Sequence, residues 1–186
     1  MEIKEFGDLH ALTTRFTGLD QERLALLREA GEALGEELDE VVAEFYSALR
    51  TEPEMDAHLP DTLDHLKAAQ REWLKRAFFG QYDQDHAQGL RQIGLVHFSV
   101  ELPLEFMALG MNRMRSTIQR RLVGHYAERP DRLSEVLEAL NAALDHNLLM
   151  MEYTYIESAM AGELEDFLEI TGMSRDLFNN LAQMNR

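Results

Sequence analysis

Apolar residues recur every three or four positions along most of this chain, which is the spacing of one face of an α-helix. Between residues 19 and 50 this stripe is long and is interrupted near Gly35, so two helices are predicted there. Further helices are predicted from about residue 61 to 80, from 83 to about 100, from 104 to about 126, and from 130 to about 161. No stretch alternates apolar and polar residues for long enough to predict a β-strand. The fold class is therefore expected to be all-α.

Proline, glycine and acidic residues mark the expected ends of these helices. Asp61 and Asp64 are expected to cap the helix that ends at Gly80, because carboxylates favour helix N-termini and glycine favours C-termini. Pro130 suits the first position of the last long helix. Beyond that helix the chain is amphipathic but matches no obvious core. We therefore expect a domain of residues 1–161 followed by a C-terminal helical extension of residues 162–186.

The size and charge of the chain exclude several classes of function. Its 186 residues and 45% hydrophobic content suit one globular domain that can enclose an internal pocket. Asp and Glu number 34 against 18 Lys and Arg, which gives a formal net charge of −16. The densest basic stretch, residues 113–121, is expected to be a solvated helix face. A surface this acidic would repel nucleic acid, so nucleic-acid binding is not expected.

The chain has no cysteine, so disulfides, thiolate metal sites and cysteine nucleophiles are excluded. Any metal ligand must therefore be nitrogen or oxygen. The N-terminus lacks the basic and apolar order of a signal peptide, and no apolar run reaches the ~18 residues that span a bilayer. We expect a cytoplasmic protein without membrane insertion.

Of the seven histidines, His97 is the one expected to point into an apolar interior. Leu90, Ile93 and Val100 share its helical face, whereas the other six histidines have polar neighbours in the sequence. Gly94, one turn earlier, leaves room for a flat group or another helix to approach. A buried histidine is more often a satisfied core residue than a ligand. Because no di-iron, zinc or phosphate-binding motif is present, His97 is nevertheless the strongest candidate for metal chemistry.

Three segments give the sequence a family resemblance. Residues 93–103, Ile-Gly-Leu-Val-His-Phe-Ser-Val-Glu-Leu-Pro, resemble the proximal signature of the globin domain in bacterial globin-coupled sensors. Residues 44–49 resemble the Phe-Tyr segment of that family, and residues 66–74 resemble its distal helix. The resemblance covers about residues 20 to 160. It departs at Glu101, where the family usually has glycine, and at Phe106-Met107, where it often has Trp-Tyr.

The resemblance implies a globin fold with an extra N-terminal helix and long C-terminal helices, which binds haem b. It implies that His97 is the proximal ligand and the only protein ligand to the iron, and that Tyr46 is the distal phenol. The other residues expected to contact the haem or its gas ligand are Phe45, Leu66, Ala69, Ile93 and Gly94. Since Leu66 and Ala69 are apolar, the pocket is expected to be dry, with one hydrogen-bond donor. The alternative for Tyr46 is a core aromatic whose hydroxyl bonds a backbone carbonyl.

The same resemblance implies an oxygen sensor, with CO and NO as further candidate ligands. Ligation would be relayed through the C-terminal helices to an effector domain such as a diguanylate cyclase, a histidine kinase or a chemotaxis transducer. No motif of such an effector occurs in these residues, so we expect a sensory domain that is not an enzyme, with residues 162–186 as the start of the linker. The alternatives are a haem globin enzyme, such as an NO dioxygenase or a peroxidase-like protein, and a haem-free helical dimerisation module.

Apolar residues of the last long helix cover more than one of its faces. A monomeric globin would need only one apolar stripe there. We therefore expect a symmetric homodimer through the two long C-terminal helices, residues 104–124 and 133–161, in a four-helix bundle. The alternative is that the excess apolar residues pack beneath the N-terminal helix.

Overall fold

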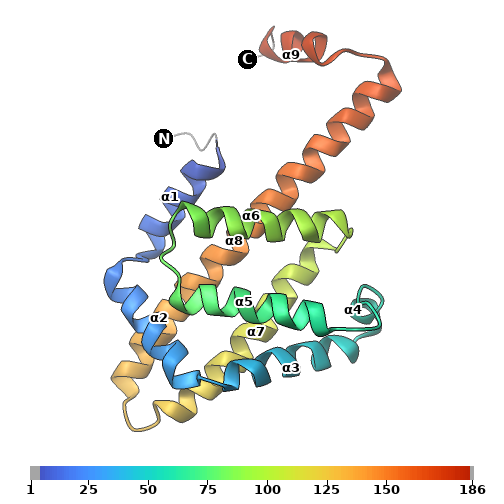
Figure 1. Ribbon diagram of the computed structural model, residues 1–186. Coiled ribbons are helices and arrows are strands. Elements are labelled where there is room, and N and C mark those ends of the chain that lie inside the picture. The colour runs from blue at the N-terminus through green and yellow to red at the C-terminus, as the bar shows by residue number, and fades with distance from the viewer. Residues whose placement is uncertain (1–4, 185–186) are drawn as a thin grey trace.

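The computed structural model describes residues 5–184 and shows helices joined by short connections, with no strand in that range (Figure 1). In chain order the helices are α1 (Phe6–Thr17), α2 (Gln21–Leu34), α3 (Glu37–Arg50), α4 (Pro53–Asp56), α5 (Asp64–Phe79), α6 (Gln84–Ser99), α7 (Leu104–His125), α8 (Pro130–Thr171) and α9 (Arg175–Met184). The expected all-α class is confirmed.

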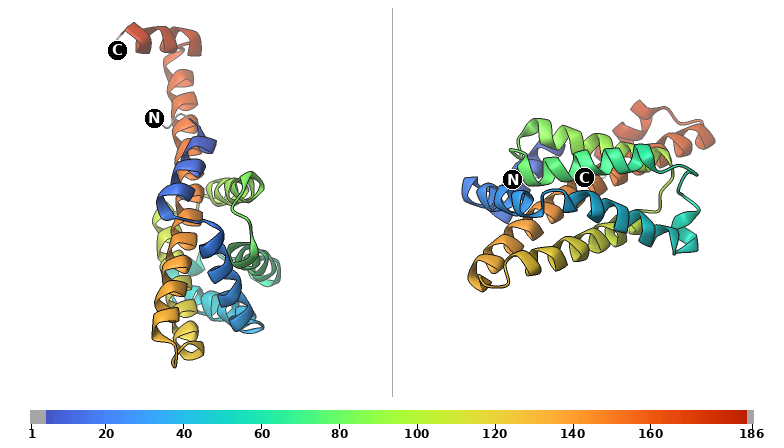
Figure 2. Two further views of the ribbon diagram at one scale, coloured as in Figure 1. Left: turned by 90° about the vertical axis from the view of Figure 1, so that its left-hand side faces the viewer. Right: turned by 60° about the horizontal axis from the view of Figure 1, so that its bottom comes forward.

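Helix α8 forms the axis of the molecule, and α6 is the helix that packs on it most extensively. Helices α1, α2 and α7 also lie on α8, while α5 rests on α2 and α3. Helices α5 and α6 lie on the same side of the molecule (Figure 2), yet they do not pack closely against each other. The second half of α3, the first half of α5 and the second half of α6 all lie at the end of the molecule near α4 (Figure 1).

Acidic residues cap two of the helices. The Asp20 carboxylate accepts hydrogen bonds from the backbone N–H groups of Glu22 and Arg23 at the start of α2. Asp83 accepts one from the N–H of His86 at 3.0 Å and so fixes the start of α6.

The predicted caps of α5 are wrong. The residue before this helix is Leu63, and no side chain caps it. Asp64 is the first helical residue, where its charge still favours the helix dipole. Asp61 lies in the preceding connection, and its backbone carbonyl accepts a hydrogen bond from Arg50 at 3.4 Å.

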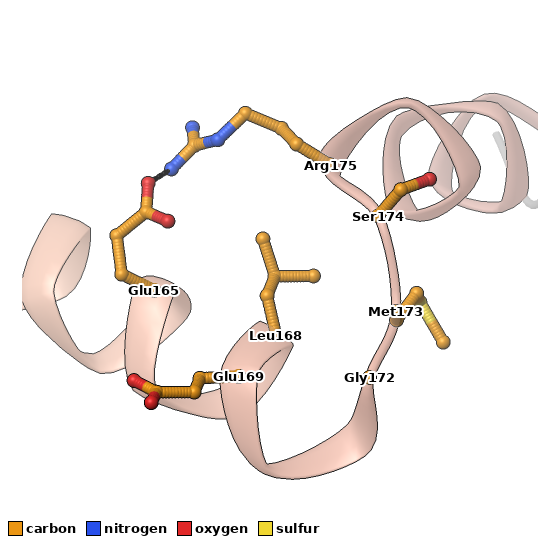
Figure 3. Close-up of a pocket in the computed structure, with 7 residues that line it drawn as sticks. All are labelled: Glu165, Leu168, Glu169, Gly172, Met173, Ser174 and Arg175. Atoms are coloured by element: carbon orange, nitrogen blue, oxygen red, sulfur yellow. Dashed lines mark hydrogen bonds and ion pairs between the residues drawn. The ribbon is translucent and has the colours of Figure 1, made fainter.

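Helix α8 does not end near Ala161, as the sequence predicts, but continues through Gly162 to Thr171. One interior glycine costs only about 1 kcal/mol relative to alanine, and Glu163 and Leu164 favour the helix. The division of the chain at residue 162 is therefore not a break in secondary structure. The chain turns at Gly172, whose φ of 65° suits glycine, and Figure 3 shows this turn with Leu168 inside it and Glu165 paired with Arg175.

The core lies between α8 and the helices around it. Its most deeply buried side chains include Leu27, Leu74, Ile118, Leu140 and Met150. Met107, Met111 and Met114 of α7 belong to this core. The basic stretch of α7 is not simply the solvated face that the sequence predicts, because it forms ion pairs with α3. Arg113, Arg120 and Arg121 all lie within 4 Å of the Glu44 carboxylate. No helix among the described residues is long and apolar enough to cross a membrane.

Candidate functional site

Helix α6 is seated on α8 by close contacts along its length. A Cβ atom on Gly94 would lie 2.5 Å from the carbonyl oxygen of Met151 and 2.9 Å from Cβ of Thr154, so only glycine allows this approach. Farther along, the rings of Phe98 and Tyr155 meet edge to face with centroids 5.5 Å apart. The structure thus shows another helix beside Gly94, which is one of the two possibilities that the sequence offers.

His97 lies in the last turn of α6 and is half-buried. Its Nδ1 atom is buried and has no hydrogen-bond partner among the described residues. Burial lowers the pKa of His97, and the nearby backbone carbonyl of Ile93 works against this shift. The ring is therefore neutral at pH 7, which is the form of imidazole that binds metals.

The side of α6 beside His97 is apolar and incompletely covered by protein. Ile93 is half-buried, Val96 is 59% exposed, and Val100 is 56% exposed. The prediction that Val100 points into the interior is wrong, because this residue follows the last turn of α6. A half-buried imidazole next to uncovered aliphatic side chains suits the binding of a large apolar group.

Tyr46 lies on α3 and is 6% exposed. Its hydroxyl makes no hydrogen bond with any residue that the structure describes, although its ring meets Phe45 edge to face at 5.2 Å. Tyr82 and Tyr126 differ, since their hydroxyls donate to the Ala77 carbonyl at 2.9 Å and to Glu29 at 3.0 Å. Burial raises the pKa of Tyr46 to about 12, so the phenol stays protonated and can donate. The backbone-bonded alternative for Tyr46 is not observed.

The remaining predicted residues fall in three different environments. Phe45 is half-buried, and its ring lies 3.5 Å from the position of a Cβ on Gly110 of α7. Leu66 is half-buried against the core, whereas Ala69 is exposed on α5. All of them, with His97 and Ile93, come from the segments of α3, α5 and α6 at the α4 end of the molecule.

The sequence prediction missed three buried histidines. His10, His86 and His146 were expected among polar neighbours, but they are 8%, 8% and 0% exposed, and they contact one another. A signal for His146 was present, because it follows Ala143 by three positions and precedes Met150 by four on the buried stripe of α8.

Comparison with known proteins identifies the family. The Protoglobin family model matches residues 8–160, so this chain belongs to the Protoglobin family. Among solved structures, the globin domain of the Geobacter sulfurreducens globin-coupled sensor is similar, with 24% identity, a TM-score of 0.73, and coverage of 78% of this chain and 96% of that one. The ferric globin domain of E. coli DosC has 19% identity and a TM-score of 0.65, with 76% of this chain and 97% of that one covered. Among curated proteins no relative was found.

Membership of a globin family implies that the chain binds a haem, and the residues present fit one. The observations that carry this fit are the unpartnered Nδ1 of His97 and the uncovered aliphatic face of α6 beside it. Histidine nitrogen is a common ligand of haem iron, and the chain has no cysteine that could take its place.

Proposed function

We propose that this chain is a gas-sensing globin domain that binds dioxygen reversibly at a haem b held by His97. Two residues support it most: His97 on α6, whose half-buried ring has a buried Nδ1 without a hydrogen-bond partner among the described residues, and Tyr46 on α3, which is 6% exposed. A buried nitrogen without a partner is costly in a core, so its presence favours a binding role for this ring.

In this proposal each residue has a defined role. His97 ligates the iron, and haem iron supplies the capacity to bind small gases reversibly. Phe45, Leu66 and Ile93 provide apolar contacts to the haem. Ala69 is exposed on α5, and its small side chain leaves room for the haem beside this helix. Gly94 acts indirectly, because its contact with α8 positions α6.

Tyr46 would select among gases. Its protonated hydroxyl donates a hydrogen bond to a polar ligand such as dioxygen, which gains more from it than carbon monoxide does. Leu66 and Ala69 carry no polar side-chain atoms, so Tyr46 is the proposed single donor. CO and NO remain further candidate ligands.

We also propose a symmetric homodimer through α7 and α8. Many of the apolar residues that cover more than one face of α8 are buried within the chain, including Val136, Leu140 and Leu144. Others are uncovered: Leu149 is 40% exposed, Ile156 44% and Met160 68%. On α7, Leu109 is 53% exposed and Val123 49%. These residues are the proposed interface.

The relay to an effector would run through α8. Because α6 contacts α8 at Gly94 and at Phe98, a displacement of the His97 helix reaches α8 directly as well as through Pro103 and α7. The proposed effector is a diguanylate cyclase, a histidine kinase or a chemotaxis transducer joined beyond α8. The proposed domain is sensory, without catalysis of its own.

An absorption spectrum of the purified chain tests the haem assignment. We expect a Soret band, and its loss in His97→Ala, with restoration by added imidazole. His65→Ala is the matched control, since His65 is exposed on α5. A Soret band that persists in His97→Ala without imidazole would reject His97 as the ligand. No Soret band after haem supplementation of the wild type would favour the haem-free dimerisation module.

A further inference from the structure

Three histidines from three different helices meet beneath α1. His10 comes from α1, His86 from the first turn of α6, and His146 from the middle of α8. Nδ1 of His10 and Nε2 of His146 lie 3.0 Å apart, and Nε2 of His86 lies 3.0 Å from Oδ1 of Asn147. We call His10, His86 and His146 the histidine cluster.

The geometry of the cluster does not suit a metal ion. The facing nitrogens of His10 and His146 bond each other, and no group of three or more potential ligands in the described residues could hold a metal. Tyr82 covers the cluster, stacked on His86 with centroids 4.2 Å apart and edge-on to His146 at 5.3 Å. The cluster is therefore a buried arrangement of neutral rings.

The hydrogen bond between His10 and His146 requires one nitrogen to donate and the other to accept. It tolerates one added proton, but two imidazolium rings would place two N–H groups face to face. A charge on His86 would also repel the other rings, since its ring centroid is 6.2 Å from that of His146. Progressive protonation therefore opposes the contact between α1 and α8.

Few charged groups surround the cluster. Asp83, in the connection before α6, favours protonation of His10 and His86, as does the Tyr82 backbone for His10. Arg76 of α5 opposes protonation of His86. On α8, Asn147 bonds His86, and on α1, the Thr14 hydroxyl lies 3.4 Å from Nε2 of His146. Among the residues that the structure describes, the single carboxylate of Asp83 is therefore too little charge to neutralise three protonated rings.

Helix α1 depends on its contacts with α6 and α8 to stay folded. It has only 12 residues, and isolated helices of that length are marginal in water. Besides His10 it buries Phe6 and Leu9, and the Phe6 ring lies 6.3 Å from the Tyr153 ring and 5.2 Å from the Arg91 guanidinium. Because these contacts are few, weakening the cluster shifts α1 toward its undocked state.

We propose that the histidine cluster is a proton-sensitive latch, which holds α1 on α6 and α8 when its rings are neutral and releases α1 when they take up protons in mild acid. This inference goes beyond the proposed function and does not depend on haem or gas. Burial lowers the pKa of all three histidines, that of His146 to about 3. Because the released rings bind protons more tightly than the docked ones, docking is weakened as pH falls below about 6.5.

Hydrogen exchange at about pH 7.5 and 5.5, corrected for intrinsic exchange rates, measures this release in the intact protein. Protection of residues 6–17 should fall about tenfold for each histidine that charges only on release. Amides of α7 should keep their protection and so exclude global unfolding. Unchanged protection of α1 between these pH values would overturn the proposal.

Variants assign the effect to the cluster. His10→Gln keeps a hydrogen-bonding side chain without a titratable ring, so the pH dependence of α1 protection should weaken by about tenfold. His86→Gln provides a second test if His10→Gln docks poorly. His125→Gln is the control, because His125 of α7 pairs with Glu37 of α3, whereas α1 packs mainly on α8 and α6. Equal pH dependence in the wild type and in both cluster variants would also overturn the proposal.

Discussion

The backbone of Gly94 on α6 lies against the carbonyl oxygen of Met151 on α8, where a Cβ atom would be 2.5 Å away. Neither partner can yield easily, since both atoms belong to helix backbones. The position of the helix that carries His97 is thus set by a glycine one turn before it.

Gly94→Ala is therefore expected to separate α6 from α8. Overpacking of this kind costs about 1–3 kcal/mol, which urea unfolding would measure. Gly162→Ala is the matched control, because nothing lies within 4 Å of its added Cβ and alanine favours the interior of α8. A Gly94→Ala variant as stable as the wild type would show that the contact with Met151 relaxes without cost.

Tyr46→Phe tests the proposed donor. Loss of one hydrogen bond of about 1 kcal/mol should speed dioxygen release about fivefold and leave carbon monoxide release nearly unchanged. Stopped-flow kinetics of both gases would measure this. The control is Tyr82→Phe, whose hydroxyl bonds the Ala77 carbonyl. Equal changes for both gases would indicate a steric role for Tyr46.

Sedimentation tests the proposed dimer. Ile156→Glu places a charge in the apolar patch of α8 and should weaken association by about 2 kcal/mol or more, roughly thirtyfold in Kd. Leu181→Glu, on α9 outside the proposed interface, should leave the dimer intact. A wild-type monomer at micromolar concentration, with haem bound, would rule out this interface.

Glu44 ties α3, which carries Tyr46, to α7. Its hydrogen bond from Arg120 lowers the pKa of the Glu44 carboxyl, with the nearby Arg121 and Arg113 adding to the effect. Folding stability from this carboxylate is therefore fully present above its unfolded pKa of about 4.3 and is lost as pH falls through the lower folded value. Because the group is partly exposed, Glu44→Gln should cost only about 1 kcal/mol or less.

The contribution of Glu44 should shrink with added salt, since the ion pairs are open to solvent. Thermal unfolding at two salt concentrations would show it. Glu40→Gln is the control, with one contact to Arg121 at 3.6 Å. A loss of stability from Glu44→Gln that does not change with salt would indicate packing as its cause.

Helical periodicity predicted most of the fold because the helices bury apolar residues that recur every three or four positions. The signature around His97 predicted a globin domain of the globin-coupled sensor type, and the match to the Protoglobin family confirmed the resemblance although Val100 is exposed. The short α4 was hidden by Pro53 and Pro60, which the sequence offers only as breaks. The end of α8 was misplaced because Gly162 resembles a terminator, whereas the residues after it sustain the helix.

The histidine cluster escaped prediction for a different reason. His10 and His146 are 136 positions apart in the sequence, and only the packing of α1 on α8 brings them together. The neighbouring Asp145 suggests that His146 faces solvent, but adjacent residues of a helix point in different directions. Gly94 was expected to contact the haem, and its contact with Met151 could not be predicted for the same reason, because Met151 lies 57 positions later on another helix.

Because α8 continues without a break through Gly162, a tilt of this helix displaces its far end more than its middle. From Met151 to Thr171 the helix rises roughly 30 Å at 1.5 Å per residue. If α8 tilted by about 5° where it contacts Gly94, its C-terminal end would move by roughly 2.5 Å, because no break in the helix would absorb the movement. The turn at Gly172 and α9 would thus be displaced by more than the part of α8 that contacts Gly94.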